Sequence, residues 1–175
     1  MIIAHLPAGY ILGKSCKTKR VNMKYALLGS VFPDIDMLYY YLVSDKTTNH
    51  HEYLTHIPAT YFLLAGLLLI PIFNQRVKSC LFWFLFGAFL HLILDTPVSG
   101  IAWGYPLDDT LIKLIDPSSY NIIYTPKEVY FYFFEGWVLN LANHWIFKIE
   151  LAIVLLALFI KAFTLKNWSR NEKHV

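Results

Sequence analysis

The chain has 175 residues, of which 57% are hydrophobic and only 15% are charged. Soluble domains average about 45–50% apolar and about 25% charged residues, so an ordinary soluble domain is excluded. Mean hydropathy is +0.45. The net charge of +3 comes from short basic clusters, which argues against a nucleic-acid-binding stripe. The sequence therefore predicts a single membrane-embedded domain over residues 1–175.

Two short apolar stretches open the chain, Ile2–Leu12 and Tyr25–Phe32. Each is long enough for a helix but shorter than the roughly 20 residues that a bilayer span requires. We expect two short helices that are tilted, half-inserted or packed against longer ones.

Three later segments are long and apolar enough to cross a bilayer. They run from about Leu54 to Phe73, from about Cys80 to Pro97, and from about Trp145 to Leu165. A long connector, residues 99–143, precedes the last span, and its segment Lys127–Leu141 is expected to be an interfacial helix. The predicted fold is an all-α, multi-pass membrane bundle with three long spans, two shorter N-terminal helices and this interfacial helix.

Basic residues cluster at Lys14–Lys24, at Arg76 with Lys78, and at Lys161–Lys173. The positive-inside rule places all three clusters on the cytoplasmic side of the cell (inner) membrane. The chain then starts outside, crosses repeatedly and ends inside, with a basic cytoplasmic tail over residues 166–175 and an extracytoplasmic connector.

This topology places histidine and acidic residues at every extracytoplasmic helix end. Ionisable groups at membrane depth are costly and usually functional. The histidine and acidic residues at these helix ends are His5, Asp34, Asp36, His50, His51, His56, His91, Asp95, His144 and Glu150. Because residues from the whole chain fall in one layer, we expect them to form a metal site. His50 and His144 are interpreted as bystanders.

His91 and Asp95 are four residues apart, so their side chains share one face of a helix. They can ligate a metal, or form a hydrogen bond that holds two helices together. His51 and His56 are five residues apart, which suits a turn that enters a helix. Imidazole is a common ligand for zinc, and a solvated histidine loop is the other interpretation.

Asp34 and Asp36 follow Pro33 at a predicted helix end. Two neighbouring carboxylates repel each other unless a cation neutralises them. The alternative is a helix terminus with solvated acids. Mixed His and Asp ligands without Cys match a catalytic divalent ion, zinc above all, better than a closed structural zinc site. Because the set exceeds four ligands, we expect one to three ions.

These motifs, in this order, resemble the YdjM-like family of membrane-bound metal-dependent hydrolases. The matching elements are His5, Pro33–Asp36 (PDID), His51–His56, His91–Asp95 and the Pro- and Trp-containing stretch Thr96–Pro106. The resemblance covers residues 1–107 and extends loosely to Glu150. This sequence has Glu52-Tyr53 where the family often has Arg-Gly. It has Met37 at the position after the second Asp of the PDID motif, where the family often has a His.

The family is in turn similar to zinc-dependent phospholipases C and to fungal single-strand zinc nucleases, which are all-α enzymes. The resemblance implies hydrolysis of a phosphoester, possibly lipid-linked, by a metal-activated water. The implied metal ligands are His5, Asp34, Asp36, His51, His56, His91 and Asp95, with the region of the second Asp (Asp36), His56, His91 and Asp95 at the core. A carboxylate of Asp34, Asp36 or Glu150 would serve as the general base.

Two other functions fit the same residues. A cation transporter would bind its cargo through them, although transporters place such groups near the bilayer midplane. A non-catalytic membrane protein would hold a structural metal. In each case membrane lipid is the expected partner and nucleic acid is not.

Overall fold

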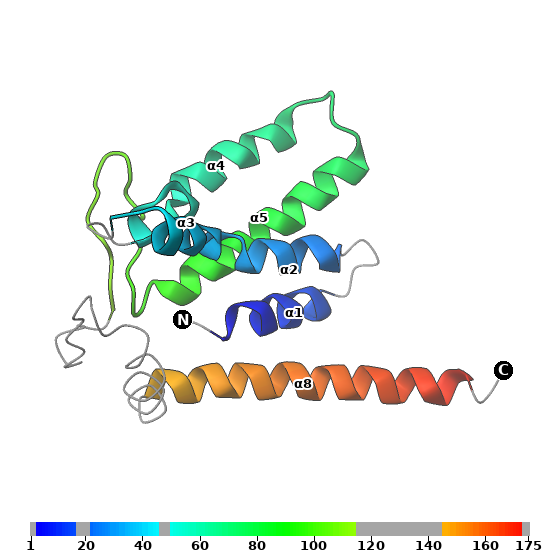
Figure 1. The fold of residues 1–175 in the computed structure, drawn as a ribbon. Coiled ribbons are helices and arrows are strands. Elements are labelled where there is room, and N and C mark those ends of the chain that lie inside the picture. Colours follow the sequence, from blue (N-terminus) through cyan, green and yellow to red (C-terminus); the bar gives the residue numbers. More distant parts are fainter. Residues whose placement is uncertain (1–2, 17–21, 46–49, 115–144, 173–175) are drawn as a thin grey trace.

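The computed structural model describes residues 3–16, 22–45, 50–114 and 145–172 (Figure 1). Within these ranges the chain forms six α-helices with short 3₁₀ turns, and its only β pairing is an isolated bridge between Ile101 and Ile112. The helices are α1 (His5–Ser15), α2 (Met23–Val31), α3 (Asp36–Leu42), α4 (Pro58–Gly66), α5 (Gln75–Asp95) and α8 (Trp145–Glu172). The all-α prediction is confirmed for this part of the chain.

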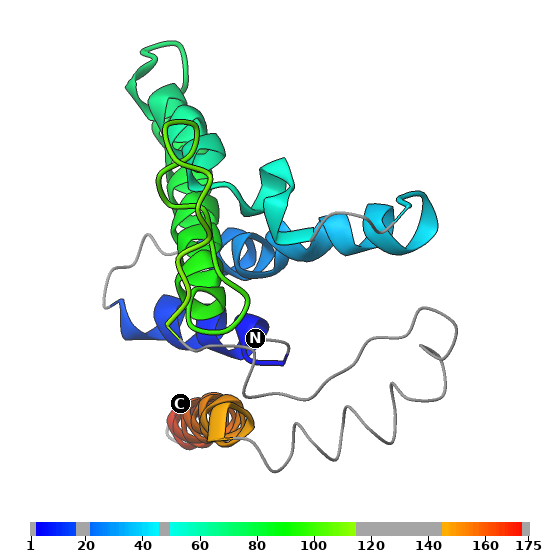
Figure 2. The same cartoon turned by 90° about the vertical axis from the view of Figure 1, so that its left-hand side faces the viewer.

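In the described part of the chain, four 3₁₀ turns lie between the α-helices or directly follow one of them. They are η1 (Pro33–Ile35), η2 (His50–Glu52), η3 (Leu54–His56) and η4 (Leu67–Leu69). Helices α4 and α5 form a hairpin, and the N-cap residue of α5 is Asn74, whose side chain accepts a hydrogen bond from the backbone N–H of Val77. Figure 2 shows α3 continuing from α2 and projecting away from this hairpin.

Helix α5 is the central helix, and α2 crosses it at very short range. A Cβ atom on Gly29 would lie 1.9 Å from the backbone oxygen of Phe84, and one on Gly87 would lie 2.3 Å from that of Ala26. Only glycine allows two helix backbones to approach so closely. This contact brings the carboxyl end of α2 beside the last turns of α5.

Only α5, among the described residues, is long and apolar enough to cross a membrane. The span expected over Leu54–Phe73 is shorter in the structure, because the apolar helix runs only from Pro58 to Leu69. Pro58 occupies a first-turn position of α4, and Ile70 is extended before Pro71, as the residue before a proline usually is. The third expected span lies within α8, which also carries Lys148, Glu150 and Lys161.

Helix α8 lies alongside α1 (Figures 1 and 2). Several of its apolar side chains are more than half exposed, among them Leu155, Leu158, Phe159 and Phe163. Exposed apolar faces of this kind suit contact with lipid.

Most of the connector, residues 99–143, and its expected interfacial helix Lys127–Leu141 lie outside the described residues, as does the end of the tail, 173–175. The first part of the connector folds back toward α5, where Ile101 is buried in the core beside Leu92.

Candidate metal centre

Histidine and carboxylate side chains from distant parts of the sequence meet at one end of the bundle. The helix ends that carry them lie on the left in Figure 1. Helices α1, α4 and α8 begin at this end, whereas α2 and α5 finish there. The residues that meet are His5 of α1, Asp34 of η1, Asp36 of α3, His51 of η2, His56 of η3, and His91 and Asp95 of α5. The structure thus brings together all seven expected ligands. The helix ends that carry Lys14, Lys24 and Arg76 lie at the opposite end.

Four of these residues form a compact donor group. One ligand atom from each of Asp34, His56, His91 and Asp95 lies within 4.8 Å of the others. His56 and His91 are fully buried, Asp95 is 1% exposed, and the Asp34 side chain is 31% exposed. The group is therefore closed toward the protein and open to solvent on the Asp34 side.

The distances within this group fit a single metal ion. His91 Nε2 lies 3.0 Å from Asp95 Oδ2 and 3.5 Å from Asp34 Oδ1, whereas His56 Nε2 lies 3.7 Å and 3.9 Å from the same two oxygens. Ligands bound tetrahedrally at about 2.0–2.2 Å lie about 3.3–3.6 Å apart. The observed separations of 3.0–3.9 Å bracket these values, so small side-chain shifts would let two nitrogens and two oxygens bind one divalent ion.

The orientation of the His91 ring is fixed at Nδ1, the nitrogen that points away from the four-donor group. Its Nδ1 lies 2.9 Å from the backbone carbonyl oxygen of Ser30, which can only accept a hydrogen bond. Nδ1 therefore carries the proton, and in the neutral ring Nε2 has the lone pair. That Nε2 is buried and makes no hydrogen bond of good geometry to any described residue. The close crossing of α2 and α5 places Ser30 for this contact.

His56 is oriented in the same way by a carboxylate. Its Nδ1 lies 2.6 Å from Asp36 Oδ2, which also accepts a hydrogen bond from the hydroxyl of Thr55. The Nε2 atom of His56 then faces Asp34 and Asp95, and within the described chain it is buried without a well-formed hydrogen bond. Metal-bound histidines generally donate their second N–H to such a partner. Asp36 thus lies behind a ligand, on the far side from the four-donor group.

His5 joins both carboxylates of the group. Its Nε2 lies 3.1 Å from Asp95 Oδ1, and its Nδ1 lies 3.4 Å from Asp34 Oδ2. Its ring stacks on that of His91, with centroids 3.7 Å apart. His5 therefore faces the oxygens of Asp34 and Asp95 that point away from His56 and His91.

The protonation of two histidines follows from their surroundings. Burial lowers the pKa of His51 to about 2, and the neighbouring His56 lowers it as well. Burial also opposes the charge on His56, but the hydrogen bond to Asp36 and the negative charges of Asp36 and Asp95 outweigh it and raise its pKa to about 9. Without a metal, His51 is therefore neutral and His56 carries a proton at neutral pH.

Glu150 lies close to this end of the molecule but contacts a different group. Its side chain is 1% exposed, and Oε2 accepts a hydrogen bond of 2.8 Å from the backbone N–H of Ile3. Glu150 thus ties α8 to the segment immediately before His5. It is not one of the four donors of the compact group.

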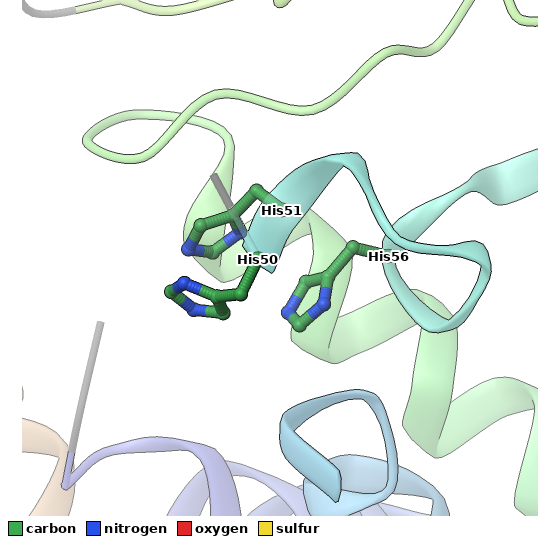
Figure 3. Close-up of side chains that lie close together, drawn as sticks. All are labelled: His50, His51 and His56. Carbon is green, nitrogen blue, oxygen red and sulfur yellow. The ribbon is translucent and has the colours of Figure 1, made fainter. Parts of the chain in front are cut away.

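The sequence interpretation set His50 aside, whereas the structure places it in a second donor group. One ligand atom from each of His50, His51 and His56 lies within 4.8 Å of the others, and Figure 3 shows the three rings on the same side of the segment that carries them. The adjacent HH pair was the available signal, but spacing alone does not show that a 3₁₀ turn directs both rings to one side. His144 lies outside the described residues.

The sequence model of the YdjM inner membrane protein family matches residues 1–169. The chain belongs to this family. Membrane localisation follows from the family, in agreement with the apolar helix α5. The chain matches no curated protein and no solved structure.

Proposed function

We propose that this YdjM family protein is a membrane-bound, metal-dependent hydrolase that cleaves phosphoester bonds. The observation that carries the proposal is the pair of oriented histidines. His56 and His91 each donate one N–H to an acceptor behind them and direct the other nitrogen toward two carboxylates. Nitrogen and oxygen ligands without thiolates, one of them reached by solvent, are typical of catalytic zinc.

A divalent cation bound there supplies a Lewis acid and lowers the pKa of a coordinated water. The chain's own residues hold and orient the reactants. Asp34, His56, His91 and Asp95 bind the ion, and Asp36 fixes the ring of His56. Asp34 has the solvent-exposed carboxylate of the group, and hydrogen bonding to His5, against the effect of burial, keeps its pKa below the usual range. It is therefore ionised and placed to take a proton from an attacking water.

The topology that we propose has three spans, with the metal centre on the extracytoplasmic face and the C-terminus in the cytoplasm. The donors lie at helix ends rather than at mid-span, which suits a surface-facing enzyme site better than a transport path. A substrate reaching such a site from the membrane is a phospholipid or a lipid-linked phosphoester. A reporter fused after Val175 tests this topology, and activity of an extracytoplasmic reporter there would overturn it.

Metal analysis of the detergent-purified protein tests the metal centre. We expect bound zinc or a similar divalent ion in the wild type and its loss in His91→Ala and Asp95→Ala. Asp108→Ala is the matched control, because Asp108 lies on an exposed loop. A wild-type protein that binds no divalent ion would refute the metal centre.

Hydrolysis of a phosphodiester and of phospholipid vesicles by the metal-loaded protein tests the enzyme. We expect turnover that disappears with the metal in His91→Ala. Full metal binding without hydrolysis of either substrate would favour cation transport or a structural metal instead.

A further inference from the structure

We propose that a second divalent cation binds between His50 and His51, with Asp95 as the carboxylate that it shares with the first cation. This inference rests on the proposed metal centre and extends it. It assigns a ligand role to His50, which lies outside the four-donor group.

The two donor groups cannot both be filled through the one histidine that they share. His56 belongs to both groups. Its Nδ1 is engaged by Asp36 at 2.6 Å, so only Nε2 is available to bind a metal. One imidazole nitrogen binds one ion, and this Nε2 faces Asp34 and Asp95. His50 and His51 therefore remain as a separate pair, with ring centroids 4.1 Å apart.

Asp95 lies within reach of both donor groups. His51 Nδ1 is 3.9 Å from Asp95 Oδ2, the same oxygen that lies 3.0 Å from His91 and 3.7 Å from His56. Two ligands of one cation are separated by up to about 4 Å at bond lengths of 2.0–2.2 Å. A carboxylate in this position bridges two ions, which in such centres are about 3.5–4 Å apart.

The second site is reached by solvent on its His50 side. His50 is half-buried, in contrast to the fully buried His56. Solvent molecules or an oxygen of the substrate would therefore complete the coordination of the second ion on this side.

Manganese alone is the probe for the test. The purified full-length protein is loaded with Mn²⁺, the bound ions are counted, and electron paramagnetic resonance reports whether they are coupled. We expect two ions per chain and an exchange-coupled spectrum in the wild type. His50→Ala and His51→Ala should each retain one ion with an isolated six-line spectrum, and that retained ion shows that the variant is folded. Glu52→Ala, an exposed residue of the same turn, should keep both ions.

The outcomes separate this inference from the proposed function. A wild type that binds one ion, lost in His91→Ala, would overturn the second site and leave the proposed centre standing. Absence of any bound ion would overturn both. A coupled pair that persists in His50→Ala and in the polar variant His50→Gln would overturn the assignment of His50.

Discussion

Replacing Asp36 by asparagine distinguishes a residue that orients a ligand from a residue that is a ligand. In the structure Asp36 Oδ2 accepts from His56 Nδ1 at 2.6 Å and from the Thr55 hydroxyl. Asparagine keeps the shape and an acceptor oxygen but removes the charge. The four donors of the compact group are unchanged, so we expect the metal to bind with the same stoichiometry but more weakly.

The size of the effect follows from the hydrogen bond to His56. Hydrogen bonds to charged groups contribute about 1.5–3 kcal/mol and hydrogen bonds between neutral groups about 0.5–1.5 kcal/mol. The substitution should therefore weaken the free energy of metal binding by about 1–1.5 kcal/mol. At about 1.4 kcal/mol per tenfold change, Kd should rise about tenfold. Asp36→Ala removes the acceptor altogether and should fall in the range of about 10–100-fold that is usual for such partners.

Isothermal titration of the metal-free protein with Zn²⁺ or Mn²⁺ measures both constants. Thr55→Val is the control, because it removes the other donor to the same carboxylate oxygen and leaves His56 paired; we expect less than about a threefold change. Complete loss of the ion in Asp36→Asn, as in His91→Ala, would make Asp36 a ligand. An unchanged Kd in both Asp36 variants would refute its role in orienting His56.

Three further predictions concern packing, pH and metal removal. Gly29→Ala places a methyl group against the backbone oxygen of Phe84 and should destabilise the protein by about 1–3 kcal/mol in denaturant titrations; Gly66→Ala, with no heavy atom within 4 Å, should be neutral or stabilising, and equal effects would contradict the close crossing. A cation must displace the proton of His56, whose pKa is raised to about 9, so metal affinity should increase from pH 6.5 to 9. The same proton stabilises the metal-free fold; this stabilisation is complete below pH 6.5 and is lost as the pH rises through 9. A metal affinity that does not change with pH would refute this prediction. Chelation should lower the thermal midpoint, by an amount that grows with the free metal concentration used before chelation, and an unchanged midpoint would contradict a metal bound to the folded state.

Sequence reasoning succeeded where the position of a residue along a helix determines its position in space. His91 and Asp95 are one helical turn apart, and their side chains meet at 3.0 Å. Because successive helices run in opposite directions, residues at several helix ends lie at the same end of the bundle. This can be predicted without knowing the packing angles. The gathering of the expected ligands could therefore be inferred from apolar segments, basic clusters and spacing.

The roles of individual residues depended on turns and on helix packing, which the sequence does not specify. Asp36 orients His56 because the 3₁₀ turn Pro33–Ile35 leads directly into α3, of which Asp36 is the first residue. Glu150 contacts the Ile3 N–H because α8 lies beside α1. Hydropathy overestimated the first span, since a run of apolar residues does not show that the helix ends before Pro71.

The same packing favours binding of a cation by these donors. The bundle buries imidazole nitrogens of His56 and His91 beside carboxylates, while many large apolar side chains of the described residues are exposed. Burying ionisable groups costs folding free energy unless they are paired, and in the metal-free state the proton on His56 provides part of the compensating charge. A divalent cation that displaces this proton provides more charge at the point where the lone pairs converge. The close contact of α2 with α5 holds Ser30 and His91 together in advance, so binding the ion requires little rearrangement of the backbone.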